Sequence, residues 1–222
     1  MSALFALLAL GQEMNADETF RKIEETIRKA GTVAVRFSCE SARRGDEKKV
    51  SASGELLLKE GNKCSYRFHK KVPGEGEVST SVVSDGTTTQ TRVNGALTRE
   101  AATRDIQNRR LSMFLARSGL FVYQLLPALF PGIRRGGPLE TLEIVDAAHG
   151  KEEDSARPVR YDLKVPGQEG PAIRVTLFYE ARTFKPLKRV VAIEDLTITE
   201  TYESFVTDSD LPDEKFALPR KE

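Results

Sequence analysis

The feature that most constrains this chain is its longest apolar stretch, residues 111–133, which reads LSMFLARSGLFVYQLLPALFPGI. Arg117, Gln124, Pro127 and Pro131 interrupt it, so it lacks the roughly 20 uninterrupted apolar residues that a membrane-spanning helix needs. A short helix that is apolar on all sides must be buried by protein or by a ligand. We therefore expect a helix against the concave face of a curved sheet. Periodicity allows two interpretations: side chains that fill a core, or a helix and sheet that enclose an apolar cavity for a lipid.

On both sides of this stretch, apolar and polar residues alternate with a period of two, which is typical of half-buried β-strands. In the clearest example, Val33, Val35, Phe37 and Cys39 share one face. Similar segments follow one another and are separated by turn sequences such as Asn94-Gly95, as in an antiparallel meander. The pattern predicts an α+β fold that is mainly antiparallel β, with about ten or eleven strands.

An amphipathic helix precedes the strands. Asn15 and Glu18 have the spacing of a capping box, and Phe20, Ile23 and Ile27 then recur at helical spacing. We predict a helix whose narrow apolar stripe covers one side of the sheet.

Residues 1–14 are interpreted as a signal-like or unstructured segment, and residues 15–222 as a single domain. The apolar run at 3–10 resembles the central region of a secretory signal, although no Lys or Arg precedes it and no A-x-A site follows it. A short anchor or a buried N-terminal element is the alternative. We expect export to the periplasm or elsewhere in a bacterial envelope.

Composition and motifs exclude several functions. With 34 Lys and Arg against 33 Asp and Glu, and with no Trp, the chain has no signature of nucleic-acid binding. Neither His69 nor His149 lies beside a catalytic motif, and no set of residues has the spacing of metal ligands. We therefore predict no catalytic residues, no metal and no cofactor, and expect a monomer that is not an enzyme.

The two cysteines, Cys39 and Cys64, fall at inward positions of alternating strands. If the strands form a meander, a third strand separates them, and the two residues lie about 9.5 Å apart. That separation is too long for a disulfide, so we expect two buried free thiols.

Three blocks of sequence, taken in order, carry a resemblance to a known family. They are the N-terminal helix with Val35-Arg36-Phe37 and GELLLK at 54–59, then VVSDGT at 82–87, and finally TFKPLK at 183–188 with LPDEKF at 211–216. Together they are similar to the LolA-type outer-membrane lipoprotein carriers and their relatives, over nearly the whole chain from Asp17.

The resemblance implies a LolA-like, half-open β-barrel with an N-terminal helix, a helical lid, and an apolar hollow that holds acyl chains of a lipid or lipoprotein. At about 0.8 kcal/mol per buried methylene, partial burial of an acyl chain supports micromolar binding. The candidate ligand-binding residues are Val35, Phe37, Leu56, Leu58, Tyr66, Phe68 and Val82 on the sheet, and Phe114, Leu115, Phe121, Leu125 and Leu129 on the lid.

Two alternatives stay open. The first is an envelope interaction or sensor module, in which the same fold is filled by its own side chains and a protein partner binds outside. The second is a hydrolase that acts on envelope polymers. The chain also departs from the carriers, because Glu60 stands where they have a basic residue that closes the lid, and Leu57 and Cys64 replace aromatic residues.

Overall fold

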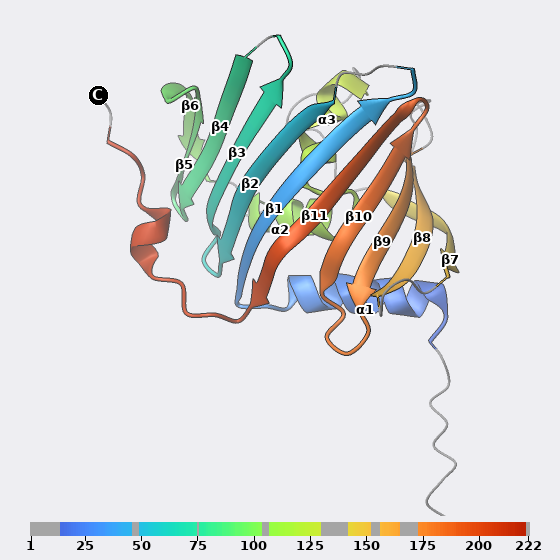
Figure 1. The fold of residues 1–222 in the computed structure, drawn as a ribbon. Coiled ribbons are helices and arrows are strands. Elements are labelled where there is room, and N and C mark those ends of the chain that lie inside the picture. The colour runs from blue at the N-terminus through green and yellow to red at the C-terminus, as the bar shows by residue number, and fades with distance from the viewer. Residues whose placement is uncertain are drawn as a thin grey trace, which may run out of the picture.

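The computed structural model describes residues 14–45, 49–74, 76–103, 107–129, 142–151, 156–164 and 173–220. For residues 107–110 and 125–129 it describes the backbone without the side chains. Within this part of the chain, eleven β-strands form one antiparallel sheet, and three α-helices accompany it (Figure 1).

The first half of the chain contributes one helix, six strands and two further helices. They are α1 (Ala16–Arg28), β1 (Thr32–Arg43), β2 (Val50–Lys59), β3 (Lys63–Val72), β4 (Gly76–Asp85), β5 (Thr88–Val93), β6 (Ala96–Ala102), α2 (Gln107–Arg117) and α3 (Leu120–Leu129). The second half contributes the remaining strands and a short 3-10 helix: β7 (Glu143–His149), β8 (Ala156–Lys164), β9 (Ile173–Glu180), β10 (Pro186–Ile193), β11 (Leu196–Thr207) and η2 (Asp213–Phe216).

The order of the strands explains where the helices lie. It runs β6-β5-β4-β3-β2-β1-β11-β10-β9-β8-β7, so the first and last strands pair in the middle and β6 and β7 form the two edges. The segment between β6 and β7 must therefore cross from one edge to the other. It does so through α2 and α3, which lie behind the sheet, on its concave face, in Figure 1. The predicted fold class, an unclosed antiparallel sheet with an N-terminal helix and helices over one face, is confirmed.

The two-residue alternation places one apolar set on the concave face. Along β1, Val33, Val35, Phe37 and Cys39 are all buried, as the pattern predicted. Inward residues of β2, β3, β8, β9, β10 and β11 join them in one core cluster with α1, α2 and α3. The helices thus complete a core that the open sheet alone would leave exposed to water.

One glycine lets this core close over the middle of the sheet. Gly54 on β2 pairs with Phe37 on β1. A Cβ atom at position 54 would lie 2.6 Å from Cζ of Phe37 and 2.5 Å from the carbonyl oxygen of Arg67. The aromatic ring therefore lies across the glycine, and any larger residue would displace it.

Helix α1 has the predicted start and the predicted buried face. The side chain of Asn15 accepts a hydrogen bond from the amide of Glu18, and the carboxylate of Glu18 accepts one from the amide of Asn15, which completes a capping box. Phe20, Ile23 and Ile27 are buried, and the ring of Phe20 meets that of Tyr161 edge-on at 5.0 Å. The helix covers the end of the sheet that β7 and β8 form (Figure 1).

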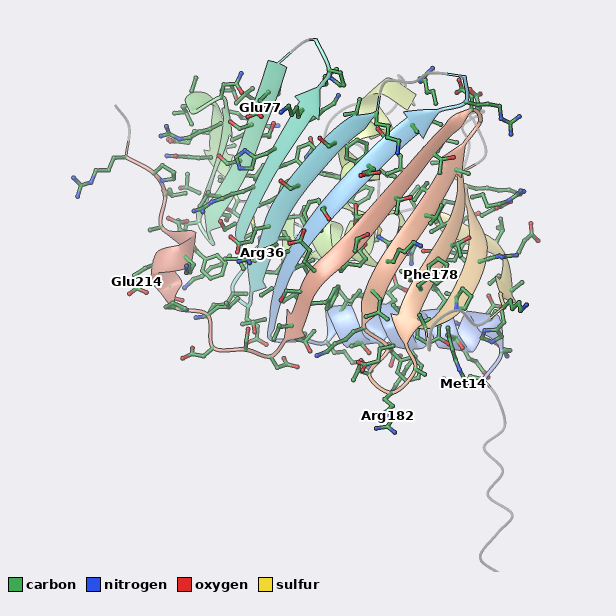
Figure 2. The ribbon with its side chains drawn as sticks, viewed as in Figure 1. Met14, Arg36, Glu77, Phe178, Arg182 and Glu214 are labelled. Carbon is green, nitrogen blue, oxygen red and sulfur yellow. The ribbon has the colours of Figure 1, made fainter. Side chains whose placement is uncertain are left out.

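The convex face of the sheet carries the opposite set of side chains, with Arg36 and Phe178 facing the viewer in Figure 2. Three cross-strand neighbours on this face, Leu57, Ser65 and Val83, are nevertheless buried. The 3-10 helix η2 packs on β3 and β4 there and buries its own Phe216.

The C-terminal tail lies on the convex face, where it forms η2, whereas the edges of the sheet are β6 and β7. Asp213 holds it there, with Oδ1 2.7 Å from Nζ of Lys59 and Oδ2 2.6 Å from Nζ of Lys63. Burial of one aromatic ring and a double ion pair therefore decide the conformation of the tail.

Other predictions concern single residues and segments. Cys39 and Cys64 are buried free thiols, as expected from the intervening strand β2. His69 is exposed on β3. The signal-like residues 1–13 lie outside the described residues, and none of the described helices has the length and apolar character needed to cross a membrane.

Candidate functional site

The candidate site is the apolar layer between the concave face of the sheet and helices α2 and α3. The structure brings together the sequence-predicted residues whose side chains it describes. Val35, Phe37, Leu56, Leu58, Tyr66, Phe68, Phe114, Leu115 and Phe121 are buried in one cluster, and the partly buried Val82 packs against it. The side chains of Leu125 and Leu129, on α3, lie outside the described residues.

A chain of aromatic rings joins the sheet to α3 within this layer. Phe37 and Tyr66 each stack on Phe68, with ring centroids 6.5 and 6.2 Å apart. Phe68 in turn meets Phe121 on α3 at 5.8 Å. Contacts of this kind add roughly 0.5–1.5 kcal/mol each to the free energy of area burial.

Tyr66 also makes polar contacts with α3. Its hydroxyl group donates to the carbonyl oxygen of Leu120 at 3.4 Å and accepts from Nε2 of Gln124 at 3.3 Å. Burial raises the pKa of Tyr66 well above its ordinary value. The phenol therefore stays neutral and keeps its donor proton for the helix.

The predicted single helical stretch is broken into α2 and α3 at Ser118 and Gly119. The amides of both residues bond to the carbonyl oxygen of Phe114, at 3.0 and 2.7 Å, and Gly119 has φ of 86°. A left-handed residue of this kind commonly ends a helix, and glycine adopts it without steric cost. The break leaves the carbonyl end of α2 and the amide end of α3 side by side, facing the sheet.

A buried ion pair on the sheet meets these two helix ends. Arg189 on β10 and Glu200 on β11 are direct cross-strand partners and are 0% and 1% exposed. Nη2 of Arg189 donates to the carbonyl oxygens of Leu115 and Ala116 at 2.7 and 2.8 Å. The carboxylate of Glu200 accepts from the amide of Phe121 at 2.9 Å and that of Leu120 at 3.2 Å.

Each charge is thus opposite in sign to the partial charge of the helix end that it contacts, which is a favourable arrangement. The cation lies at the C-terminal end of α2, and the anion lies at the N-terminal end of α3. Nη1 of Arg189 and Oε1 of Glu200 are 3.7 Å apart, farther than either group is from its helix. We call Arg189 and Glu200 the helix clamp, because the pair satisfies helix ends that would otherwise be buried without partners.

Neighbouring side chains complete the clamp. Nη1 of Arg189 donates to the hydroxyl oxygen of Tyr202 at 2.5 Å, and the thiol of Cys39 lies 3.6 Å from Oε2 of Glu200. Burial raises the pKa of the Cys39 thiol, and the charge of Glu200 raises it further. Burial would lower the pKa of Arg189, but Tyr202, Tyr161 and Glu200 outweigh it and raise that pKa. The guanidinium group therefore keeps its charge.

Gly119 is required at the clamp for a second reason. A Cβ atom there would lie 2.9 Å from Nη1 of Arg189 and 3.0 Å from Oε2 of Glu200. The two charged groups approach the backbone through the space that a side chain would fill.

Sequence reasoning missed Arg189 and Glu200, although a signal was present. Alternation along β10 places Arg189 on the same face as Val191 and Ile193, and alternation along β11 places Glu200 with Ile198. Two opposite charges at core positions of neighbouring strands indicate a buried pair. Glu60 stands at the position where the resemblance implies a basic closing residue. It lies near Gly31, directly after the end of β2.

The described side chains of the site are mainly apolar and packed against one another. Its charged groups are buried and committed to helix ends. Within the described part of the chain, no group of three or more His, Cys, Asp or Glu residues is placed to hold a metal ion.

Comparison with known proteins gives likeness in fold. No protein-family model matches the chain, and no curated protein matches it in sequence. Among solved structures, it is similar to a LolA superfamily protein from Nitrosomonas europaea, at 10% identity and a TM-score of 0.43, over 92% of this chain and 98% of the other. The lipoprotein LppX of Mycobacterium tuberculosis aligns at 9% identity and a TM-score of 0.40, over 85% and 93%.

A third similar structure is MucB of a MucB–MucA complex, at 11% identity and a TM-score of 0.38. The alignment covers 92% of this chain and 60% of the MucB chain. A LolA superfamily protein is thus among the structures that this chain resembles, and the likeness is one of fold. The fold itself is one unclosed antiparallel sheet with helices over its concave face.

Proposed function

We propose that this protein is an exported carrier, not an enzyme, that holds acyl chains of a lipid or lipoprotein between its concave face and helices α2 and α3. One observation carries the proposal: an unclosed sheet presents an apolar, aromatic-rich face, and two helices joined to it by side-chain contacts cover that face. Helices attached in this way can separate from a sheet without breaking its strand pairing.

The energetics support binding without a polar anchor. Each methylene removed from water contributes about 0.8 kcal/mol. Micromolar affinity corresponds to about 8.2 kcal/mol, so a net burial of roughly ten methylenes suffices. An acyl chain would replace the contact between Phe121 of α3 and Phe68 of the sheet with contacts to its own methylenes.

Native mass spectrometry tests the proposal most simply. The protein is purified without detergent from a lysate that contains bacterial membranes, and its mass is compared before and after lipid extraction. A stoichiometric increment that matches a phospholipid or an acylated peptide supports the carrier. An apo mass, with no uptake of added acyl lipids, favours the interaction module with a filled core.

A pair of matched variants locates the uptake. Phe121→Trp adds volume to the layer under α3, whereas Phe178→Trp makes the same change on the convex face. Because overfilling a packed layer costs about 1–3 kcal/mol, we expect Phe121→Trp to weaken uptake of a fluorescent fatty acid about tenfold. Phe178→Trp should retain wild-type uptake. Equal effects of the two variants would contradict the assignment of the site.

A further inference from the structure

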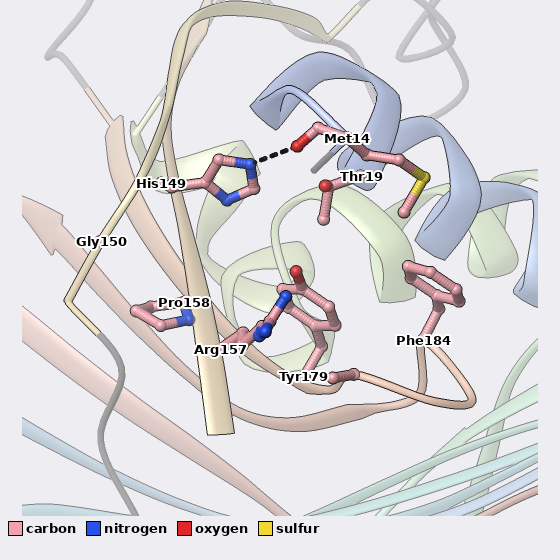
Figure 3. Close-up of a pocket in the computed structure, with 9 residues that line it drawn as sticks. Met14, Thr19, His149, Gly150, Arg157, Pro158, Tyr179 and Phe184 are labelled. Carbon is pink, nitrogen blue, oxygen red and sulfur yellow. Dashed lines mark hydrogen bonds between the residues drawn. The ribbon is translucent and has the colours of Figure 1, made fainter. Parts of the chain in front are cut away.

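A small pocket lies outside the layer between the sheet and α2–α3, at the end of the sheet that α1 covers. Met14 and Thr19 contribute from the start of α1, and Arg157 and Tyr179 from the cross-strand neighbours of β8 and β9. Figure 3 shows these side chains around one space, with His149 of β7 on one side. The start of α1 and three strands from the second half of the chain thus build one concavity.

A hydrogen bond closes one side of the pocket, and a pair of stacked aromatic rings forms an apolar wall on another. Nε2 of His149 lies 2.8 Å from the carbonyl oxygen of Met14, and since a carbonyl only accepts, the imidazole donates. This bond ties the entry of α1 to the end of β7. On the opposite side, the rings of Tyr179 and Phe184 stack at 5.9 Å with an angle of 9° between their planes.

The charge that faces the pocket is positive. Arg157 is exposed and forms no ion pair with any described residue. No acidic side chain is among the described residues that line the pocket. The nearby carboxylates of Glu18 and Glu180 accept hydrogen bonds from the amide of Asn15 and the hydroxyl of Thr183, respectively. A guanidinium group that forms no ion pair with a described carboxylate is suited to an oxyanion.

The size of the pocket limits the ligand. Its volume is about 220 Å³, below the roughly 300–1,000 Å³ of sites for drug-sized molecules. An acyl chain does not fit, but a phosphate group with a few attached carbons does. We propose that this pocket binds a phosphate monoester, with Arg157 as the donor to its oxygens. This site goes beyond the carrier function and does not require it.

The probe for the test is glycerol 3-phosphate, with inorganic phosphate as a second probe and glycerol as the uncharged reference. Amide shifts are followed by NMR at constant ionic strength. We expect saturable shifts at Thr19 and Gly150 with a Kd of about 1 mM, and none with glycerol. Shifts that grow linearly without saturation would overturn the proposal.

Two arginine variants distinguish the pocket from general surface charge. Arg157→Gln removes the guanidinium group from an exposed strand position, so the fold is expected to survive. It should raise the Kd at least about tenfold. Arg182→Gln removes an equal charge at the tip of the β9–β10 turn (Figure 2), outside the pocket lining. It should change the Kd less than about twofold. Equal losses in both variants would show nonspecific attraction and overturn the site.

A comparison of two lipids identifies the source of the phosphate group. Lysophosphatidic acid and a monoacylglycerol with the same chain are compared below their aggregation concentrations. Preference for the phosphate-bearing lipid, lost in Arg157→Gln, assigns the pocket to a lipid headgroup. Equal uptake of both lipids, with glycerol 3-phosphate still saturating, assigns it to a free phosphate compound. Failure of all lipid uptake would contradict the carrier function and leave the glycerol 3-phosphate result standing.

Discussion

At the scale of single residues, the helix clamp is the most informative feature of the molecule. Arg189 and Glu200 are buried charges that stabilise the fold only while each keeps its partners. Removal of one partner from a buried pair leaves an uncompensated charge, whereas removal of both can be nearly neutral. The clamp therefore makes the position of α2 and α3 depend on two side chains of the sheet.

A double-mutant cycle measures this dependence. We expect Arg189→Met and Glu200→Gln each to lower the free energy of unfolding by about 3–5 kcal/mol, and the double variant to lose clearly less than the sum. Urea unfolding provides the values. The exposed pair Arg174–Asp162 is the control, and its disruption should cost less than about 1 kcal/mol. Additive losses at the clamp would show that the two charges act independently.

Gly119 gives a second prediction at this scale. Gly119→Ala should be more destabilising than Gly74→Ala, although both glycines have φ of 86°, because only at position 119 would a Cβ atom meet other atoms. We expect about 1 kcal/mol for the backbone strain alone and about 1–3 kcal/mol more for the clash with the clamp. The comparison uses urea unfolding of both variants. Equal losses would mean that the clamp can move away from the helix junction.

At the scale of elements, the C-terminal tail is held to the convex face by the ion pairs of Asp213. Hydrogen bonds from Lys59 and then Lys63 lower the pKa of this carboxyl group to about 2. Since the folded-state pKa is below the unfolded-state value, the contribution to stability is fully present above about pH 4. It is lost as the pH falls through the folded-state value.

An NMR titration of side-chain carboxyl groups tests this attachment. Asp213 should titrate near pH 2 in the wild-type protein, and Lys63→Met should move its pKa upward, toward the ordinary value for Asp. As the pH falls below 4, release of η2 should expose Phe216 and increase proteolysis of the tail. A wild-type pKa near the ordinary value would show that the tail is not bound through Asp213 in solution.

The elements also show what could be predicted from the sequence. Period-two alternation and turn residues predicted the strands and their meander order, because both signals are local. The capping box of Asn15 and Glu18 likewise located the start of α1. The break at Gly119 was missed, because an apolar run continues through it and its cause, close approach of Arg189, lies far away in the sequence.

At the scale of the whole molecule, the missed features depend on which strands become neighbours. Arg189 and Glu200 become partners only in the register of β10 with β11, and α2 and α3 meet them only because β6 and β7 lie at opposite edges. The tail packs on β3 and β4 for a similar nonlocal reason. The pocket at Arg157 requires α1 and the strands β7, β8 and β9 to meet. Sequence pattern therefore predicted the apolar layer, but not the polar contacts that hold it.

The proposed carrier binds acyl chains on its concave face, under α2 and α3. The most direct measurement is a set of isotope-filtered NOEs between protonated palmitate and methyl groups of the otherwise deuterated protein. Residues of the opposite face provide the control, because Val35 and Leu56 belong to the core on the concave face, whereas Leu57 and Val83 lie on the convex face. We predict NOEs to Val35 and Leu56 and none to Leu57 and Val83. NOEs to both faces, or none at saturating palmitate, would contradict the carrier function.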